Sequence, residues 1–383
     1  MKVIIIGGGI GGLTTALACQ HFNLDFEVFE AAPEIREVGA GIWVPPNAMQ
    51  VMHRLGLSEA IKMAGKELES ISVGGPSGRI WYTLHTKDVV SKFQFGTIAI
   101  HRARLQSVLH GALDQSRVHT GRRLNNISTT GTKVTAHFDD GTSASGDCVI
   151  GADGLRSETR KYLFGELPLR YSGQTCWRGI VKHKLPMELR GAMRELWGKH
   201  PGQRFAYSQI TDDEVYYYGT MAAPAGETNA PATVKNVLSR NFRSFGEIAE
   251  AIISDIDASA VIRTDLFDLR PIKTWTKGNI ALVGDAAHAT TPNLGQGAAQ
   301  AIEDAFVLAA ELKEGASDTG PAFARYQARR IQKAHHVVNT SWKFGQLTNM
   351  RNPIGISIRN WVIRTTPSFI TDRQIEKVYK VNF

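Results

Sequence analysis

The chain has 383 residues, 43% hydrophobic and 21% charged, and its 44 Lys and Arg against 36 Asp and Glu give a formal net charge of +8. This length suits two domains, and the sequence contains no run of 18 apolar residues that would predict a transmembrane helix. Three scattered cysteines exclude a disulfide framework and a zinc site, which suits a cytoplasmic protein. Because no uninterrupted basic block occurs, nucleic acid is not the expected partner, and phosphate-bearing cofactors would explain part of the positive charge equally well.

The first predicted elements are a buried strand, Val3–Ile6, and a helix over about 10–22. Between them, Gly7, Gly9 and Gly12 form the pattern G-x-G-x-x-G. Gly7 permits a tight turn, Gly9 lets a pyrophosphate approach the backbone, and Gly12 lets the helix pack closely on the strand. Because these glycines interrupt the apolar run and only one Lys precedes it, a secretion signal is not expected.

A second strand, Phe26–Glu30, ends in an acid that lies 18 residues after Gly12. A carboxylate at this place can accept hydrogen bonds from a ribose diol. The strand, the glycine turn, the helix and this acid together predict a dinucleotide site.

Two later strands also end next to an acid. Cys148–Ala152 precedes Asp153-Gly154, and Ile280–Val283 precedes Gly284-Asp285. Open α/β sheets bind ligands at the carboxyl ends of their strands, although Gly284-Asp285 taken alone would favour an ordinary strand-to-turn exit with Asp285 as a helix cap. After Asp285, Pro292 lacks a backbone N–H group, and Gly295 and Gly297 follow it. A helix is predicted to begin between Gly295 and Ala298. Its first N–H groups have no partner within the helix and would point at the negative charge of a reduced flavin.

In this order and spacing, the motifs resemble the single-component FAD monooxygenases of the p-hydroxybenzoate hydroxylase type. Within that group the chain is most similar to the salicylate, urate and 6-hydroxynicotinate hydroxylases and to the zeaxanthin epoxidase-like branch. The resemblance covers about residues 1–340 and is carried by the glycine motif, Glu30 with Arg36, Arg102-x-x-Leu105, Asp153-Gly154 with Ser157 and Arg160, and Gly284-Asp285-Ala-Ala-His288 through Pro292 and Gly295-x-Gly297.

The resemblance implies a role for each matching residue. Glu30 would bind the adenosine ribose of FAD, and Arg36 and Arg102 would lie near its phosphates and ribityl chain. Asp285 would bind the ribityl and pyrophosphate part, and Asp153-Gly154 would serve both FAD and the transient NADPH or NADH. The implied reaction is insertion of one oxygen atom of O₂, through a flavin C4a-hydroperoxide, into an aromatic or lipophilic small molecule. No metal is expected.

The expected architecture is α/β, with a Rossmann-like FAD-binding domain, an α+β substrate domain built on an antiparallel sheet, and C-terminal helices. We assign residues 1–70, 97–168 and 268–340 to the FAD-binding domain, 71–96 and 169–267 to the substrate domain, and 341–383 to the helical segment. The last segment carries Trp, Phe and basic residues, and we expect it to pack on the domain seam rather than lie on a membrane.

Three residues on predicted strands of the substrate domain are candidates for substrate binding and catalysis. Arg204 and Tyr216 have a spacing that resembles the substrate-binding Arg and Tyr of urate hydroxylases, and Arg178 follows Trp177. An Arg can clamp an anionic substrate and a Tyr can polarise a phenolic oxygen, although strand residues of these types often only pack across strands. Near the expected flavin face, Gly41 is followed by the predicted loop 43–47, where Trp43 would form an apolar wall that favours a flat aromatic or lipophilic substrate over urate.

Two alternatives remain open at this point. A reductase or saturase of the same fold would bind FAD but release a product without added oxygen. A dinucleotide-sensing binding protein would use the first glycine motif but would leave the Asp153 and Asp285 motifs without a role. The motifs do not distinguish NADH from NADPH, hydroxylation from epoxidation, or a monomer from an oligomer.

Overall fold

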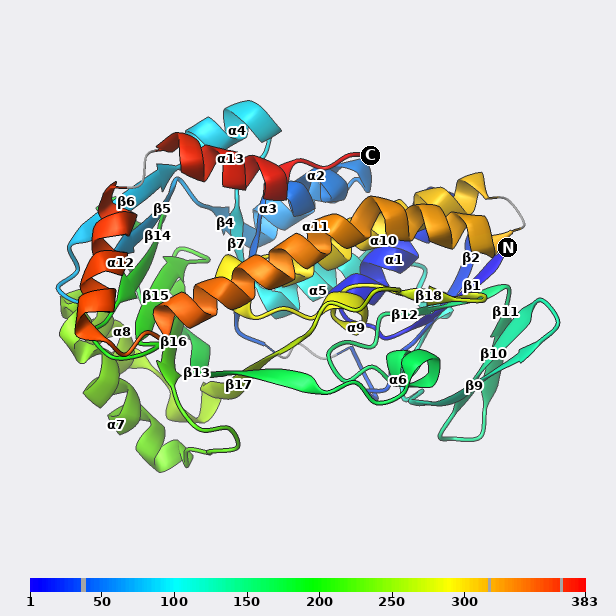
Figure 1. Ribbon diagram of the computed structural model, residues 1–383, viewed down its shortest axis with the longest axis horizontal. Coiled ribbons are helices and arrows are strands. Elements are labelled where there is room, and N and C mark those ends of the chain that lie inside the picture. Colours follow the sequence, from blue (N-terminus) through cyan, green and yellow to red (C-terminus); the bar gives the residue numbers. More distant parts are fainter. Residues whose placement is uncertain (36–38, 316–317, 366–367) are drawn as a thin grey trace.

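The computed structural model describes residues 1–35, 39–315, 318–365 and 368–383. Figure 1 shows a six-stranded sheet towards one end of the molecule and a seven-stranded sheet towards the other, with the long helix α11 (Thr319–Thr348) running along both. The predicted α/β architecture with a second, sheet-based α+β domain is confirmed.

The first half is built on a sheet with the strand order β18-β19-β12-β1-β2-β8. Neighbouring strands are parallel except for β18 and β19. The central strands are almost wholly buried Val and Ile, as expected for a parallel sheet covered on both faces. The strands are β1 (Lys2–Ile6), β2 (Asp25–Phe29), β8 (Val118–His119), β12 (Cys148–Gly151), β18 (Thr276–Lys277) and β19 (Ile280–Leu282).

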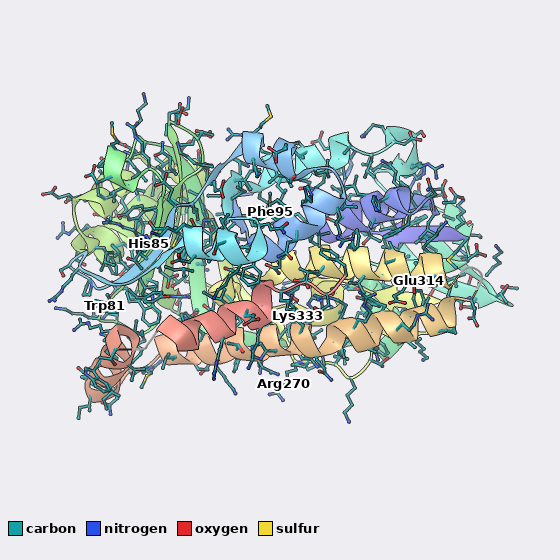
Figure 2. The ribbon with its side chains drawn as sticks, turned by 90° about the horizontal axis from the view of Figure 1, so that it is seen from above. Trp81, His85, Phe95, Arg270, Glu314 and Lys333 are labelled. Atoms are coloured by element: carbon teal, nitrogen blue, oxygen red, sulfur yellow. The ribbon has the colours of Figure 1, made fainter. Side chains whose placement is uncertain are left out.

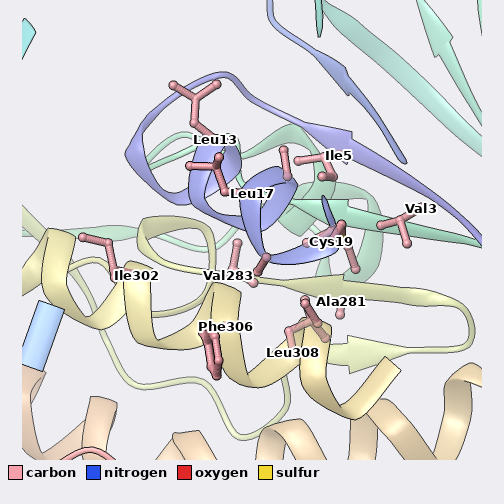
Figure 3. Packing of buried hydrophobic residues seen from close by; sticks show 14 of the residues in the cluster. Val3, Ile5, Leu13, Leu17, Cys19, Ala281, Val283, Ile302, Phe306 and Leu308 are labelled. Carbon is pink, nitrogen blue, oxygen red and sulfur yellow. The ribbon is translucent and has the colours of Figure 1, made fainter. Parts of the chain in front are cut away.

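Two helices, α1 (Ile10–His21) and α10 (Gly297–Glu314), form much of the core with this sheet. Figure 3 shows Leu13 and Leu17 of α1 in one cluster with Ile302 and Phe306 of α10. α10 begins at Gly297, within the range from Gly295 to Ala298 that the sequence predicted for its start. Other helices of this half are α2 (Pro46–Arg54), α3 (Ser58–Ala64), α5 (Arg102–Gly111), α6 (Glu158–Phe164) and α9 (Asp285–His288).

Two small antiparallel sheets complete this half. The predicted loop 43–47 is wrong: Trp43 lies in β3, which pairs with β7, and Pro46 is the first residue of α2. Proline is favoured at a first helical position because its N–H is not needed there and its φ is already helical. The strands are β3 (Gly41–Val44), β4 (Gly65–Glu67) and β7 (Ile98–His101) in one sheet, and β9 (Leu124–Thr130), β10 (Lys133–Phe138) and β11 (Ser143–Gly146) in the other.

The second half is built on a sheet with the order β17-β13-β16-β15-β14-β5-β6. Its neighbouring strands are antiparallel except for β5 and β14, which are parallel because β5 enters from an earlier part of the chain. The strands are β5 (Ser70–Gly74), β6 (Ile80–His85), β13 (Leu169–Lys182), β14 (Ala192–Trp197), β15 (Arg204–Gln209), β16 (Glu214–Ala222) and β17 (Ile262–Leu269).

Alternation along these strands gives the sheet two different faces. Phe205, Tyr207 and Tyr217 pack on one face against the helices α7 (Pro231–Phe242) and α8 (Glu247–Asp255). The neighbouring residues Arg204, Tyr216 and Tyr218 lie on the other face and line a pocket. We call the face that packs on α7 and α8 the back of the sheet and the face that lines the pocket its front.

The remaining elements are short helices and the C-terminal helices. α11 is continuous across residue 340, where the sequence alone suggested a domain boundary. None of the helices in the described part of the chain is long and apolar enough to cross a membrane. The elements are α4 (Thr86–Phe93), α12 (Pro353–Thr365), α13 (Ser368–Tyr379), and the 3₁₀ helices η1 (Gln115–Arg117), η2 (Met187–Leu189), η3 (Arg243–Phe245), η4 (Ala258–Ala260) and η5 (Pro292–Leu294).

Candidate active site

A cavity of about 380 Å³ lies between the carboxyl ends of the parallel strands and the front face of the seven-stranded sheet. It brings together residues that are up to 292 positions apart, from Gly9 to Ala301. Of the predicted site residues, those that line it are Gly9, Gly41, Arg102, Gly154, Arg178, Arg204, Tyr216, Asp285, Pro292, Gly295 and Gly297.

The three glycines of the first turn have different surroundings. Gly7 has φ +109°, and a Cβ on it would lie 2.5 Å from the carbonyl oxygen of Ala152. A Cβ on Gly12 would lie 1.8 Å from the carbonyl oxygen of Gly7, so no larger residue fits. A Cβ on Gly9, which lines the cavity, would meet no atom of the described residues within 4 Å. Gly7 and Gly12 are thus required by the turn itself, whereas Gly9 keeps space open for a ligand.

Glu30 directly follows β2 and is held beside the glycine turn. Its Oε2 accepts a hydrogen bond of 2.6 Å from the N–H of Gly8, and its Oε1 accepts one of 2.8 Å from the N–H of Ala32. Each carboxylate oxygen keeps a further lone pair for an incoming hydroxyl group. Arg36, predicted to act nearby, lies outside the described residues.

Asp153 has a local partner that the sequence motif did not reveal. Its Oδ1 accepts from the Ser157 hydroxyl at 2.6 Å, and its Oδ2 accepts from the N–H and the hydroxyl of Thr159 at 2.9 and 3.0 Å. Burial raises the pKa of Asp153, and these hydrogen bonds oppose that rise. The structure therefore turns this carboxylate to the start of α6, while the adjacent Gly154 faces the cavity.

Three charged side chains face the cavity together. Burial and the nearby charge of Arg178 lower the pKa of Arg102, and the charge of Asp285 opposes this. Asp285 is accessible from the cavity but enclosed by protein elsewhere, so desolvation raises its pKa, against the effects of His288, Arg102 and Arg160. Nε of Arg178 is buried and has no hydrogen-bond partner within the described residues. The cavity thus has a net excess of positive charge.

The turn before α10 presents a second set of backbone N–H groups. Gly295 adopts the left-handed conformation with φ +61°, after which α10 begins at Gly297. Among the described residues, no side-chain hydrogen bond caps the N-terminus of α10 or that of α1, and both N-termini line the cavity. Two uncapped helix N-termini and three arginines around one cavity fit an anionic, pyrophosphate-bearing cofactor such as FAD.

The front of the seven-stranded sheet supplies an aromatic wall. The ring of Trp43 lies edge-on to the rings of Tyr216 and Tyr218, at centroid distances of 5.8 and 6.0 Å. Nε1 of Trp43 donates to the Ser208 hydroxyl at 3.1 Å, which fixes the indole. Gly41 is needed here because a Cβ on it would lie 2.2 Å from Cγ of Tyr216.

Arg204 lines the cavity but is already well bonded. It is 3% exposed, its Nε donates to the Thr220 hydroxyl at 3.2 Å, and its Nη2 donates to Oδ1 of Asn293 at 2.7 Å. Its Nη1 lies 3.7 Å from Oε1 of Glu195. Of the two arginines that were predicted on this sheet, Arg178 is therefore the one with free hydrogen-bonding capacity.

Glu195 is a site residue that the sequence analysis missed. It lies in β14, is 7% exposed, and accepts a hydrogen bond from the hydroxyl of Tyr218 and one of 2.6 Å from Nε1 of Trp197. The sequence did contain a signal for it, because alternation along β14 places this acid on the same strand face as the apolar residues Met193 and Trp197, where a charged residue is unusual. Only the fold shows that Tyr218 and Arg204 lie opposite it.

A buried ionic cluster supports the cavity from behind. Asp304 accepts from the N–H of Gly284 at 3.0 Å, from Nε2 of His288 at 2.5 Å and from Nε of Arg330 at 2.7 Å. Through its bond to Asp304, His288 packs in the turn that follows Asp285. The cluster holds the turn that contains Asp285.

Comparisons with known proteins agree with this geometry. Residues 1–341 match the model of the family described as FAD binding domain. The chain is 35% identical to aurachin C monooxygenase/isomerase of Stigmatella aurantiaca, covering 98% of this chain and 97% of the relative. It is 32% identical to 2-heptyl-3-hydroxy-4(1H)-quinolone synthase of Pseudomonas aeruginosa, covering 99% and 98%.

A solved structure is similar over the same extent. Klebsiella pneumoniae HpxO, crystallised with FAD and uric acid, superposes with a TM-score of 0.91 at 28% identity, covering 99% of this chain and 96% of HpxO. The family match, the HpxO complex and the cavity agree on FAD as the cofactor. The chain belongs to the FAD-binding-domain family and is an FAD-dependent monooxygenase.

Proposed function

We propose that this chain uses NADPH or NADH and O₂ to add one oxygen atom to a flat, bicyclic aromatic substrate that carries an acidic N–H or O–H group. The observation that carries this proposal is the pairing of Tyr218 with Glu195 at the cavity wall. Because the Tyr218 hydroxyl donates a hydrogen bond to Glu195, its oxygen presents lone pairs to the cavity and can accept a hydrogen bond from the substrate.

The cavity walls favour a planar ring system. Trp43, Tyr216 and Tyr218 surround the space next to the turn before α10, and Ile42 and Cys176 add apolar surface. Aromatic rings in such an arrangement stabilise a flat aromatic ligand by stacking and edge contacts. An apolar substituent on the substrate would contact Ile42 and Trp43.

The proposed proton transfer uses residues of this chain. The acidic proton of the substrate moves to the Tyr218 oxygen as the Tyr218 proton moves to Oε2 of Glu195, which leaves an anionic, electron-rich substrate and a neutral Glu195. Arg178, whose side chain lines the cavity, would hold the anion by charge-assisted hydrogen bonds. Arg204 would keep Glu195 in place and hold the sheet against the turn at Asn293.

Other residues would bind the cofactor. The amides of Gly9 to Gly11 and the α1 dipole would hold the pyrophosphate, Glu30 the adenosine ribose, and Arg102 and Asp285 the ribityl and phosphate region. The amides at Gly297 would face the flavin ring, beside Pro292 and Gly295. When bound, FAD supplies the hydride acceptance and the oxygen activation.

Names of the relatives support the substrate class. One relative makes 2-heptyl-3-hydroxy-4(1H)-quinolone, and HpxO was crystallised with uric acid. Both names denote bicyclic rings that carry N–H groups. Because Trp43 adds an apolar wall, we favour an alkylated quinolone-like ring over the more polar uric acid.

The test is anaerobic stopped-flow reduction by NADPH or NADH with 2-heptyl-4(1H)-quinolone, uric acid or salicylate, followed by mixing with isotopically labelled O₂. We expect 2-heptyl-4(1H)-quinolone to accelerate flavin reduction and to gain one labelled oxygen atom. A product reduced without added oxygen would instead favour the reductase or saturase alternative. A purified chain that cannot be loaded with FAD would contradict the whole assignment.

A further inference from the structure

Helix α12 presents an apolar face outwards. Ile354, Ile358 and Trp361 are 71%, 57% and 64% exposed, and their spacing of four and three residues places them on one side of the helix. In Figure 2 α12 lies at one end of the molecule, next to Trp81, where it covers strand β6. The expectation that this segment only packs on the domain seam is therefore incomplete.

The inward side of α12 carries a buried arginine between partly buried isoleucines, Ile356 and Ile363. Arg359 is 6% exposed, and its guanidinium lies 4.9 Å from the ring centroid of Trp197. Its Nε also donates to Oδ1 of Asn360 at 3.0 Å. α12 thus keeps Ile354, Ile358 and Trp361 exposed while its Arg359 is buried, and this uncovered apolar area points to an apolar partner outside the chain.

The charge around this face is one-sided. Residues 319–371 contain eight Lys and Arg and no Asp or Glu. Arg325, Arg329, Arg330 and Lys333 are neutralised by acids of α10. Near α12, Lys343, Arg351 and Arg364 are exposed, and none of them has an ion-pair partner in the described residues.

We propose that α12 docks this chain on a membrane surface that contains anionic lipid, with Ile354, Ile358 and Trp361 in the headgroup boundary and Lys343, Arg351 and Arg364 facing the phosphates. Exposed apolar residues and a Trp flanked by cations are the features of an interfacial helix. A second copy of this chain fits less well, because two copies paired through α12 would bring these cations together. The docking would give the enzyme access to lipophilic substrates that partition into the membrane.

The test is co-sedimentation of the FAD-loaded full chain with vesicles of phosphatidylcholine and phosphatidylglycerol, compared with phosphatidylcholine alone. We expect the chain to sediment with the anionic vesicles and to be largely released by high salt. The double variant I358S/W361S should bind about tenfold more weakly, because it removes apolar area that would be buried in the boundary. These side chains are exposed, so the variant should keep its FAD and its melting temperature.

Two further variants separate the explanations. Met63 is 88% exposed but lies alone on α3, so M63S should bind vesicles as the wild type does. The charge variant K343E/R351E should lose the preference for anionic vesicles. The proposal is overturned if the wild type stays in the supernatant, if I358S/W361S binds as well as the wild type, or if light scattering shows a dimer that this variant dissociates.

Discussion

Arg204 donates a hydrogen bond of 2.7 Å from Nη2 to Oδ1 of Asn293, and this bond joins the seven-stranded sheet to the turn before α10. Asn293 also donates from Nδ2 to the Thr291 hydroxyl and to the carbonyl oxygen of Ser341, both at 3.0 Å. The substrate wall and the proposed flavin-facing turn are therefore parts of one hydrogen-bonded unit.

The variant N293A should test this connection. Removing a partner of a buried charged group should lower the free energy of unfolding by about 1.5–3 kcal/mol, measured by urea denaturation. We also expect more hydrogen peroxide and less product per NAD(P)H, because the turn is no longer held against the sheet. The exposed amide of Asn125, bonded to Asp139, is a matched control, and N125A should change stability by less than about 0.5 kcal/mol. Equal effects of the two variants would contradict the prediction.

Gly9 and Gly12 should respond differently to the same methyl group. G9A adds a Cβ that meets no atom within 4 Å in the part of the chain that the structure describes, so the apoprotein should keep its melting temperature while FAD affinity falls at least about tenfold. G12A places a Cβ 1.8 Å from the Gly7 oxygen and should destabilise the apoprotein itself. Fluorescence titration with FAD and thermal unfolding of the apoproteins measure both effects. A G9A chain that binds FAD as tightly as the wild type would show that the cofactor does not approach this turn.

The Tyr218–Glu195 pair should control the pH dependence of turnover. The side-chain amide introduced by E195Q cannot take a proton, so the substrate must bind already ionised, and kcat/KM for 2-heptyl-4(1H)-quinolone should fall about 100-fold at neutral pH and recover as pH rises. Y218F should behave in the same way. Tyr217 is the neighbouring residue on the opposite face of the strand, so Y217F should keep the pH profile of the wild type. An unchanged pH profile in E195Q would remove Glu195 from the proposed mechanism.

Asp304 should contribute to acid sensitivity. Burial by itself raises its pKa, but the charges of His288 and Arg330 outweigh this and bring the pKa to about 2, below its usual value of 3.8. Because the pKa is lower in the folded state, the ionised group stabilises the fold above about pH 4, and this contribution of about 2 kcal/mol is lost as pH falls towards 2.

The free energy of unfolding of D304N should lack the part of the pH dependence that comes from ionisation of Asp304. At neutral pH this variant should also be about 3–5 kcal/mol less stable, because it leaves Arg330 buried with less compensation. The exposed pair of Glu59 and Lys62 supplies the control, and E59Q should cost less than about 1 kcal/mol. Urea unfolding of the three proteins across this pH range makes the comparison, and parallel curves for D304N and the wild type would refute it.

Trp43 should set the preference for apolar aromatic substrates. W43A removes the indole that lies against Tyr216 and Tyr218, and we expect KM for 2-heptyl-4(1H)-quinolone to rise at least about tenfold. W43F keeps an aromatic ring, so its KM should lie between those of the wild type and W43A. Steady-state kinetics decide this, and unchanged values of KM and kcat in W43A would exclude a role for this wall.

The sequence by itself determined the cofactor half of this protein. The buried strand, the spacing of Gly7, Gly9 and Gly12, and the acid at Glu30 are local, because a phosphate turn is made by consecutive residues whose conformational demands are visible in the residue types. The strands that carry Arg204 and Tyr216 were also visible from their alternating pattern.

Only the tertiary structure decided what these side chains contact. Glu195 meets Tyr218 and Arg204 across three neighbouring strands, and the sequence pattern fixes alternation along a strand but not the register between strands. Asp153 has the expected position in the chain, yet its carboxylate is taken by Ser157 and Thr159. Which face of α12 is exposed likewise depends on the segments that cover its other face, among them β6 and Trp197. Side-chain partners and exposure depend on packing between distant segments, which no local pattern records.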